Sequence, residues 1–163
     1  MKMGLFTTKK TADYTIIIGC GRLGANLANT LSDGGGNVLI MDKDKDAFRK
    51  LSPSFGGLAV VGDGTDFDAL QDAQIGKASV VVVVTNNDNA NVMIAQLARE
   101  VFKVNRVIAR LYDPEREYIY HEFGIDTICP AVLSAKEIEK ILSKTNEAAG
   151  TGMAVSACEV EAK

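Results

Sequence analysis

Three glycines at close spacing are the residues of this chain whose arrangement most directly predicts chemistry. Gly19, Gly21 and Gly24 form a GxGxxG pattern between the β-branched run 14–18 and leucines that recur at helical spacing. Such a turn lets the backbone approach a phosphate closely, and the unpaired N–H groups at a helix start favour an anion. We therefore predict a nucleotide phosphate site; a turn without a ligand is the alternative. The predicted loop consists of Gly19, Cys20, Gly21, Arg22, Leu23 and Gly24.

A carboxylate follows the next predicted strand, where nucleotide-binding folds hold the ribose. Asp42 stands directly after the predicted strand 37–41. A carboxylate there accepts hydrogen bonds from both ribose hydroxyls and repels the 2′-phosphate of NADP. Lys43 beside it weakens that repulsion, and a solvated strand-end aspartate is the alternative interpretation. We predict that Asp42 and Lys43 belong to the nucleotide site and that NADP is disfavoured.

Polar residues also follow the third and fourth predicted strands. Ligands of open α/β sheets bind at the carboxyl ends of the strands, so these residues are expected to face the adenosine half. Asp63 can accept a hydrogen bond from the adenine amino group. Asn86 and Asn87 are explained equally well as turn or helix-capping residues. The candidates after these two strands are Asp63, Gly64, Thr65, Thr85, Asn86 and Asn87.

Two arginines extend the predicted phosphate site. Arg22 lies inside the glycine loop, where a guanidinium suits a terminal phosphate better than a bare pyrophosphate. ATP or ADP therefore competes with NAD as the expected ligand, and a surface arginine on a first helical turn is the alternative. Arg110, at the end of the fifth predicted strand, is the weaker second candidate.

Strands and helices alternate along the chain and must position these residues. Continuous apolar strands joined by helical crossovers predict a doubly wound α/β sheet, a Rossmann fold with about six mainly parallel strands and helices on both faces. The expected strands are 14–18, 37–41, 58–61, 80–84, 106–110 and 127–129. The expected helices are 22–33, 44–51, 66–73, 87–102, 114–123 and 134–142, the last started by a capping box from Ser134 to Glu137.

Length and composition limit the function classes. With 163 residues we expect one nucleotide-binding domain over 14–142, a flexible arm over 1–13 and a flexible tail over 143–163, without a separate substrate domain. A net charge of -3 without a basic stripe argues against nucleic-acid binding. The three cysteines lack zinc-binding spacing, which indicates a reducing cytoplasm, and no apolar run is long enough to cross a membrane.

The residues expected of an enzyme are sparse. The chain carries neither a GxSxG elbow nor an HExxH metal motif. Its only histidine, His121, lies far along the chain from the glycine loop. Cys20 sits at a helix start that would lower a thiol pKa, but its place in the turn favours a packed filler over a nucleophile. We therefore expect a protein that senses its nucleotide without transforming it.

The chain closely resembles the TrkA-N, or RCK N-lobe, family over about residues 14–142. The stretches that carry this resemblance are IIIGCGRLGANLA, VVGDGTD, VIARLYDPE and FGIDTICP. The resemblance implies binding of NAD(H), ATP, ADP or AMP. It assigns phosphate contacts to Gly19, Gly21, Arg22 and Gly24, the ribose to Asp42, and the adenosine to Asp63 and Thr65, with Thr85 and Asn86 closing the site.

The same resemblance implies a function and partners. Its members are cytoplasmic regulatory subunits of Trk and Ktr potassium-uptake systems, held at the inner face of the membrane by a potassium transporter or channel subunit. The implied assembly is a homo-oligomer, a dimer or a ring of dimers, and a separate chain would supply the C-terminal lobe. Many relatives bind an intersubunit metal through a glutamate where His121 stands here, and the adjacent Glu122 would point elsewhere, so we predict no metal site.

Two other functions fit the sequence. One is a small NAD-dependent oxidoreductase subunit that borrows its substrate domain from another chain. The other is an assembly scaffold whose nucleotide is permanent and structural. Exchange of bound nucleotide, or turnover of NADH, separates both from a sensing role.

Overall fold

The structure is a computed structural model that describes residues 14–150, with side chains described to Ser143. The predicted arm over 1–13 and the end of the predicted tail, 151–163, lie outside the described residues. The chain divides into two compact units, one up to Cys129 and one from Pro130. The first unit carries every candidate site residue.

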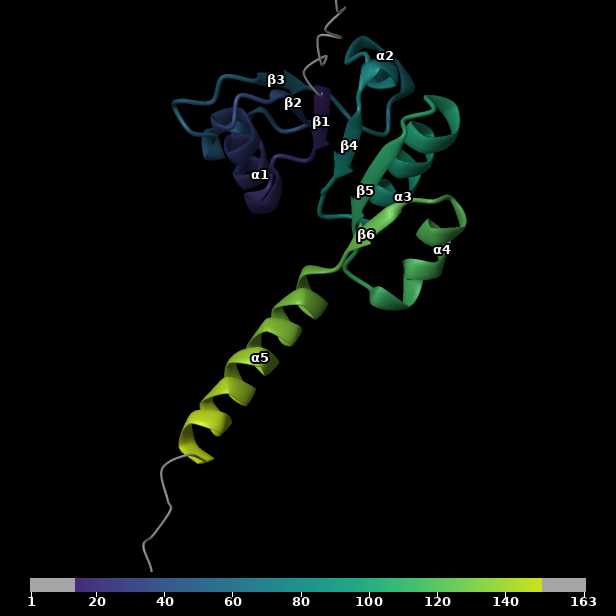
Figure 1. The fold of residues 1–163 in the computed structure, drawn as a ribbon. Helices are drawn as coiled ribbons and strands as arrows, with labels where there is room; N and C mark the ends of the chain where they lie inside the picture. Colours follow the sequence, from purple (N-terminus) through teal and green to yellow (C-terminus); the bar gives the residue numbers. More distant parts are fainter. Residues whose placement is uncertain (1–13, 151–163) are drawn as a thin grey trace, which may run out of the picture. The chain divides into compact units, whose positions relative to one another are not determined.

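Six parallel strands of the first unit form one sheet, in the order β3-β2-β1-β4-β5-β6 (Figure 1). The strands are β1 (Tyr14–Ile18), β2 (Asn37–Asp42), β3 (Leu58–Val61), β4 (Val80–Val83), β5 (Arg106–Arg110) and β6 (Asp126–Ile128). Isoleucine and valine dominate the central strands because both faces of a doubly wound sheet are buried. The order runs outward from β1 in both directions, which confirms the predicted Rossmann architecture.

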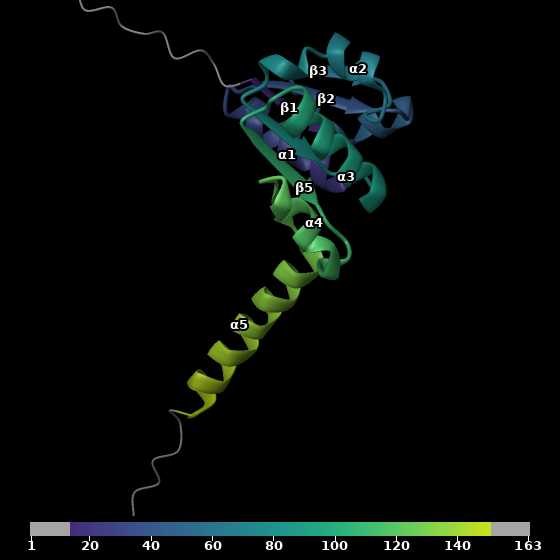
Figure 2. The ribbon, with the colours of Figure 1, turned by 90° about the vertical axis from the view of Figure 1, so that its right-hand side faces the viewer.

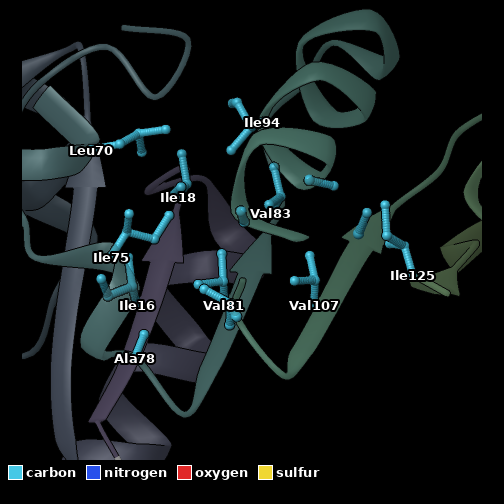
Figure 3. Close-up of a cluster of buried hydrophobic side chains, with 14 of the residues drawn as sticks. Ile16, Ile18, Leu70, Ile75, Ala78, Val81, Val83, Ile94, Val107 and Ile125 are labelled. Atoms are coloured by element: carbon cyan, nitrogen blue, oxygen red, sulfur yellow. The ribbon is translucent and has the colours of Figure 1, made fainter. Parts of the chain in front are cut away.

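Helices cover both faces of this sheet. They are α1 (Arg22–Asp33), η1 (Lys45–Lys50), α2 (Phe67–Asp72), η2 (Ile75–Lys77), α3 (Asp88–Gln96), η3 (Leu97–Val101), η4 (Pro114–Arg116) and α4 (Glu117–Glu122). The side chain of Ile17 packs with residues of α1 and η1 on one face. Ile16 and Ile18 belong to a cluster on the other face, together with residues of α2, α3 and α4, and Figure 3 shows them with Leu70 and Ile94 of that cluster. Figure 2 shows the ribbon of these helices from a second side. Because successive side chains of a strand point to opposite faces of the sheet, one apolar run contributes to a hydrophobic core on each face.

Several helical segments differ in type from the sequence-based expectation. The predicted helix 44–51 is a short 3-10 helix, η1, whose N-cap Asp44 accepts a hydrogen bond from the Asp46 amide. The predicted helix 87–102 ends in a π-helical segment, η3. The predicted helix 114–123 begins as the 3-10 turn η4 before it continues as α4. Apolar spacing identifies these segments as helical, but it does not determine to which carbonyl each amide donates its hydrogen bond, and this is what distinguishes the helix types.

The described residues of the second unit form one helix, α5 (Pro130–Gly150). The predicted capping box is wrong, because the helix begins at Pro130 and Ser134 lies inside it. Proline suits a first helical position, since its fixed φ matches the helix and its missing N–H would have no partner there. The helix also continues past residue 142 into 143–150, where alanines favour it. Across residues 14–150, no helix is long and apolar enough to span a membrane.

The packing of α4 depends on one buried phenol. Tyr120 is 1% exposed, and its hydroxyl donates to the carbonyl oxygen of Asp88 at 3.3 Å. Burial, followed by the charge of Asp88, raises the pKa of Tyr120 to about 12. The native state therefore retains a proton that the unfolded state begins to lose near pH 10. Stability from this group is complete below pH 10 and is lost as the pH rises through 12.

We expect Tyr120→Phe to flatten the alkaline loss of stability. Urea unfolding measured between pH 8 and pH 11.5 should show that the wild type loses about 2 kcal/mol more stability than the variant by pH 11.5. At pH 8 the variant should be less stable by about 1 kcal/mol, the value of one hydrogen bond. The control is Tyr118→Phe on the same helix, because Tyr118 is 64% exposed. Parallel alkaline slopes for the wild type and Tyr120→Phe would contradict the prediction.

Candidate nucleotide-binding site

A cavity of about 540 Å³ opens at the carboxyl ends of strands β1 to β5. This is the edge where ligands of open α/β sheets bind. The structure brings twelve of the fifteen predicted site residues into its wall. They are Gly19, Cys20, Gly21, Asp42, Lys43, Asp63, Gly64, Thr65, Thr85, Asn86, Asn87 and Arg110. Arg22, Leu23 and Gly24 do not line it.

The three glycines of the loop have different physical roles. Gly19 has a φ of +108°, and a Cβ there would lie 2.9 Å from the Thr85 amide nitrogen. A Cβ on Gly24 would lie 1.9 Å from the Gly19 carbonyl oxygen, so the packing of α1 on the sheet requires a glycine there. A Cβ on Gly21 would meet no atom within 4 Å. Packing of the chain therefore explains Gly19 and Gly24, whereas Gly21 borders open space.

The N-terminus of α1 begins beside that open space. Gly21 is its N-cap and supplies no capping side chain. The first amides of a helix have no partner within the helix, so an anion beside Gly21 would meet unpaired donors and the positive end of the helix dipole. Arg22 is exposed on the first turn of α1, and its role as a phosphate contact stays a prediction.

Asp42 joins the end of β2 to the glycine loop. Its Oδ2 accepts a hydrogen bond from the Cys20 amide at 2.6 Å, and its Oδ1 accepts one from the Asp44 amide at 2.9 Å. A carboxylate has about four lone-pair sites, so both oxygens retain capacity for ribose hydroxyls. The two backbone bonds orient the carboxylate at the cavity wall before any ligand arrives.

The loop after β3 forms its own small hydrogen-bonded turn. Oδ1 of Asp63 accepts from the amide of Thr65 at 2.9 Å and from its hydroxyl at 2.7 Å. These bonds, aided by the charge of Lys43, hold the pKa of Asp63 below its ordinary value. Asp63 is therefore ionised at neutral pH, and its second oxygen remains available as an acceptor.

Asn91 is a residue beside the cavity that the sequence analysis missed. It is fully buried on the first turns of α3. Its Oδ1 accepts from the Thr85 amide at 3.1 Å and from the Thr85 hydroxyl at 2.6 Å. Its Nδ2 donates to the Thr85 carbonyl at 3.3 Å and to the Arg110 carbonyl at 3.0 Å. One amide side chain thus ties the end of β4 to the end of β5. The available signal was a polar residue on the apolar face that carries Ile94 and Ala95.

The polar residues before α3 serve that helix as well as the cavity. Oδ1 of Asn87 accepts from the Ala90 amide at 3.0 Å, so Asn87 is the N-cap of α3. Its place in the cavity wall is compatible with both interpretations of the sequence. Asn86 also lines the cavity and is exposed.

The cavity wall also contains the Cys20 thiol and a lysine, Lys50, that the sequence analysis did not predict. The Cys20 side chain is buried and donates to the Ala47 carbonyl at 3.4 Å. Burial and the charge of Asp42 raise the pKa of Cys20, so it remains a thiol at neutral pH, as the packed-filler interpretation requires. Lys50 of η1 lines the cavity as a second cation beside Lys43.

A second hollow, of about 470 Å³, lies elsewhere on the first unit. It is built around Phe67 and Phe102, whose stacked rings have centroids 5.0 Å apart, and Lys77 is the charged residue that lines it. It lacks the glycine loop and the strand-end carboxylates. The chemistry predicted from the sequence therefore belongs to the larger cavity.

The residues considered for a metal lie on α4. Nε2 of His121 is 3.5 Å from Oε1 of Glu117, and both side chains are largely exposed. Within the part of the chain that the structure describes, no three histidine, cysteine, aspartate or glutamate side chains lie close enough to hold a metal ion.

Comparison with known proteins agrees with this geometry. The family model of the TrkA-N domain matches residues 15–130, which include the glycine loop and the ends of strands β1 to β5. The chain belongs to the TrkA-N domain family. The resemblance based on the sequence stretches is therefore confirmed, and this TrkA-N domain places its cavity at the edge formed by those stretches.

The relatives and solved structures are similar over most of this TrkA-N domain. The Trk system potassium uptake protein TrkA of Streptomyces coelicolor is 41% identical over 125 residues, which are 77% of this chain and 56% of that protein. This chain spans about half the length of the curated relatives that it matches. The GsuK channel bound to NAD has a TM-score of 0.71 at 26% identity, over 83% of this chain and 24% of that chain. GsuK bound to ADP has a TM-score of 0.69 at 26% identity, over 82% and 35%.

Proposed function

We propose that this TrkA-N domain is a regulatory subunit of a potassium-uptake system, which binds NAD(H) or an adenine nucleotide and controls transport. The observation that carries the proposal is the open space at Gly21, between the uncapped start of α1 and the carboxylate of Asp42. A phosphate fits the first of these groups and a ribose the second. The partner is a membrane potassium transporter, which holds the chain at the cytoplasmic face.

The ligand classes follow from the cavity and from the solved relatives. NAD and ADP are bound in the GsuK structures, at 26% identity to this chain. The same groups of this chain suit an adenosine with a phosphate tail. The carboxylate of Asp42 disfavours a 2′-phosphate, so we expect NADP to bind more weakly than NAD.

Sensing rather than turnover agrees with the groups that line the cavity. Its described lining contains no histidine, and its thiol is protonated at neutral pH. A regulatory subunit needs only ligands that bind two arrangements of an oligomer unequally, because that difference shifts the gate. We propose a homo-oligomer for this reason.

Calorimetric titration of the purified chain with ATP, ADP, AMP, NAD, NADH and NADP tests the proposal. We expect binding of adenosine compounds, with affinities that differ by at least about tenfold among them, equivalent to about 1.4 kcal/mol. Deleting the gene for this chain in its native cells should change the rate of potassium uptake, and re-expression should restore the original rate. Absence of binding to every compound, or equal affinities together with unchanged uptake, would remove the proposal. Consumption of NADH by the chain with any partner would favour an oxidoreductase.

A further inference from the structure

Arg110 has an unusual environment at the end of β5. Its Nε is buried and has no hydrogen-bond partner among the described residues. Its Cζ lies 4.1 Å from the centroid of the Tyr112 ring, and the residue lines the cavity. None of the ion pairs in the described chain involves Arg110. A buried guanidinium donor without an acceptor is costly, so an acceptor supplied by the ligand would satisfy it.

The sheet register places Arg110 on the same row as the glycine loop and the ribose carboxylate. Met41 pairs with Ile18, Ile18 with Val83, and Val83 with Ala109. The residues that follow these four leave the sheet side by side, in the order Asp42, Gly19, Val84 and Arg110. Neighbouring strands are about 4.8 Å apart, so Asp42 and Arg110 are separated by about 14 Å along the edge.

That spacing distinguishes ligands by the length of their phosphate tail. A ribose at Asp42 places the first phosphate beside the glycine loop, one strand away. Further phosphates are needed to cross β4 and come within reach of a side chain on β5. A nucleoside monophosphate has only this first phosphate, so its tail ends at the glycine loop and does not reach β5.

We propose, on the basis of the proposed function, that Arg110 binds the terminal phosphate of a nucleoside di- or triphosphate and so selects ADP and ATP over AMP. Its guanidinium can donate two parallel hydrogen bonds to phosphate oxygens. Opposite charge and a buried donor act together at this end of the cavity, whereas the glycine loop contacts the first phosphate of every nucleotide alike.

Two neighbours position this arginine before the ligand arrives. Asn91 donates to the Arg110 carbonyl at 3.0 Å, which fixes the backbone at the end of β5. The Tyr112 ring stacks on the guanidinium, and the Tyr112 amide donates to the Asp88 carboxylate at 3.0 Å. A side chain held in this way loses less freedom on binding. Asn91 and Tyr112 are therefore positioning residues for Arg110.

Titration of Arg110→Gln and Arg110→Lys with ATP, ADP, AMP and adenosine tests the assignment. In the wild type, ADP should bind more tightly than AMP. Arg110→Gln should weaken ADP and ATP by about 10- to 100-fold, the range for a hydrogen bond to a charged group, and should change AMP and adenosine by less than about threefold. Arg110→Lys should recover part of the ADP affinity, because it retains the charge without the fork. The control is Arg116→Gln, because Nη2 of Arg116 donates to Asn89 and Arg116 lies outside the cavity lining.

Thermal unfolding without ligand separates ligand recognition from a structural role. The melting temperature of Arg110→Gln should equal or exceed that of the wild type, because a buried donor without a partner is removed. Equal weakening of all four ligands, or a lowered melting temperature without ligand, would overturn the assignment and leave the proposed function standing. Unchanged ADP affinity in Arg110→Gln would also overturn the assignment of Arg110 and leave the proposed function standing. Failure of the wild type to bind any nucleotide would instead reject the proposed function, and the assignment with it.

Discussion

Gly21→Val is expected to abolish nucleotide binding while the protein remains folded. The Gly21 backbone is extended, with φ of −74° and ψ of −172°, so a side chain introduces no backbone strain there. An added Cβ meets no protein atom within 4 Å. The valine would occupy the space that the phosphate needs beside the start of α1, so we expect affinity to fall by more than about 100-fold, as for lost charged hydrogen bonds. Loss of the glycine N-cap costs about 1 kcal/mol of stability.

Calorimetry with ADP and NAD measures the affinity, and circular dichroism reports the fold. The matched control is Gly76→Val in η2, where an added Cβ has its nearest neighbour, the Phe102 carbonyl oxygen, at 3.7 Å. Gly76 lines the other hollow, so this variant should bind nucleotide as the wild type does. Wild-type affinity in Gly21→Val would show that the phosphate lies elsewhere and would contradict the proposal that it binds at the start of α1.

Asn91→Leu is expected to destabilise the protein by about 3–5 kcal/mol, because several buried polar groups lose their partners at once. The amide of Thr85 and the carbonyl of Arg110 each lose a hydrogen bond to Asn91. Leucine has a similar volume, so cavity formation contributes little, and the loss is one of hydrogen bonding. Urea unfolding of the wild type and the variant at one pH measures the difference.

The control for this substitution is Asn89→Leu, two residues earlier on α3. Asn89 is exposed and accepts one hydrogen bond, from Arg116 at 2.9 Å. Its replacement should cost less than about 1 kcal/mol, as is usual for surface positions. If the two variants proved equally stable, Asn91 would not tie β4 to β5 in the way that the structure indicates. A nucleotide that binds the native state should raise the stability of Asn89→Leu as much as that of the wild type.

The sequence predicted the sheet well because its central strands are buried on both faces. Runs such as 16–18 and 80–84 are apolar at every position, and each is followed by glycine or polar residues at the carboxyl edge. Gly19, Gly21 and Asp42 line the cavity at this edge, and the family comparison confirms the resemblance. These features depend on residues close together in the chain.

Helix type and helix ends were predicted less well. The start of α5 was placed at a capping box, but the helix begins at Pro130. The 3-10 geometry of η1 and the π-helical end of α3 were not expected. These details follow from individual hydrogen bonds, and a pattern of apolar spacing is compatible with more than one of them.

By itself the sequence determined the order of strands and helices, the position of the glycine loop and the family, because local spacing encodes each of them. Tertiary structure alone decided that Asn91 joins Thr85 to Arg110, and that Nε of Arg110 has no partner among the described residues. Whether a polar group is satisfied depends on segments that meet only after the sheet has formed. The chain order of these residues does not contain that information.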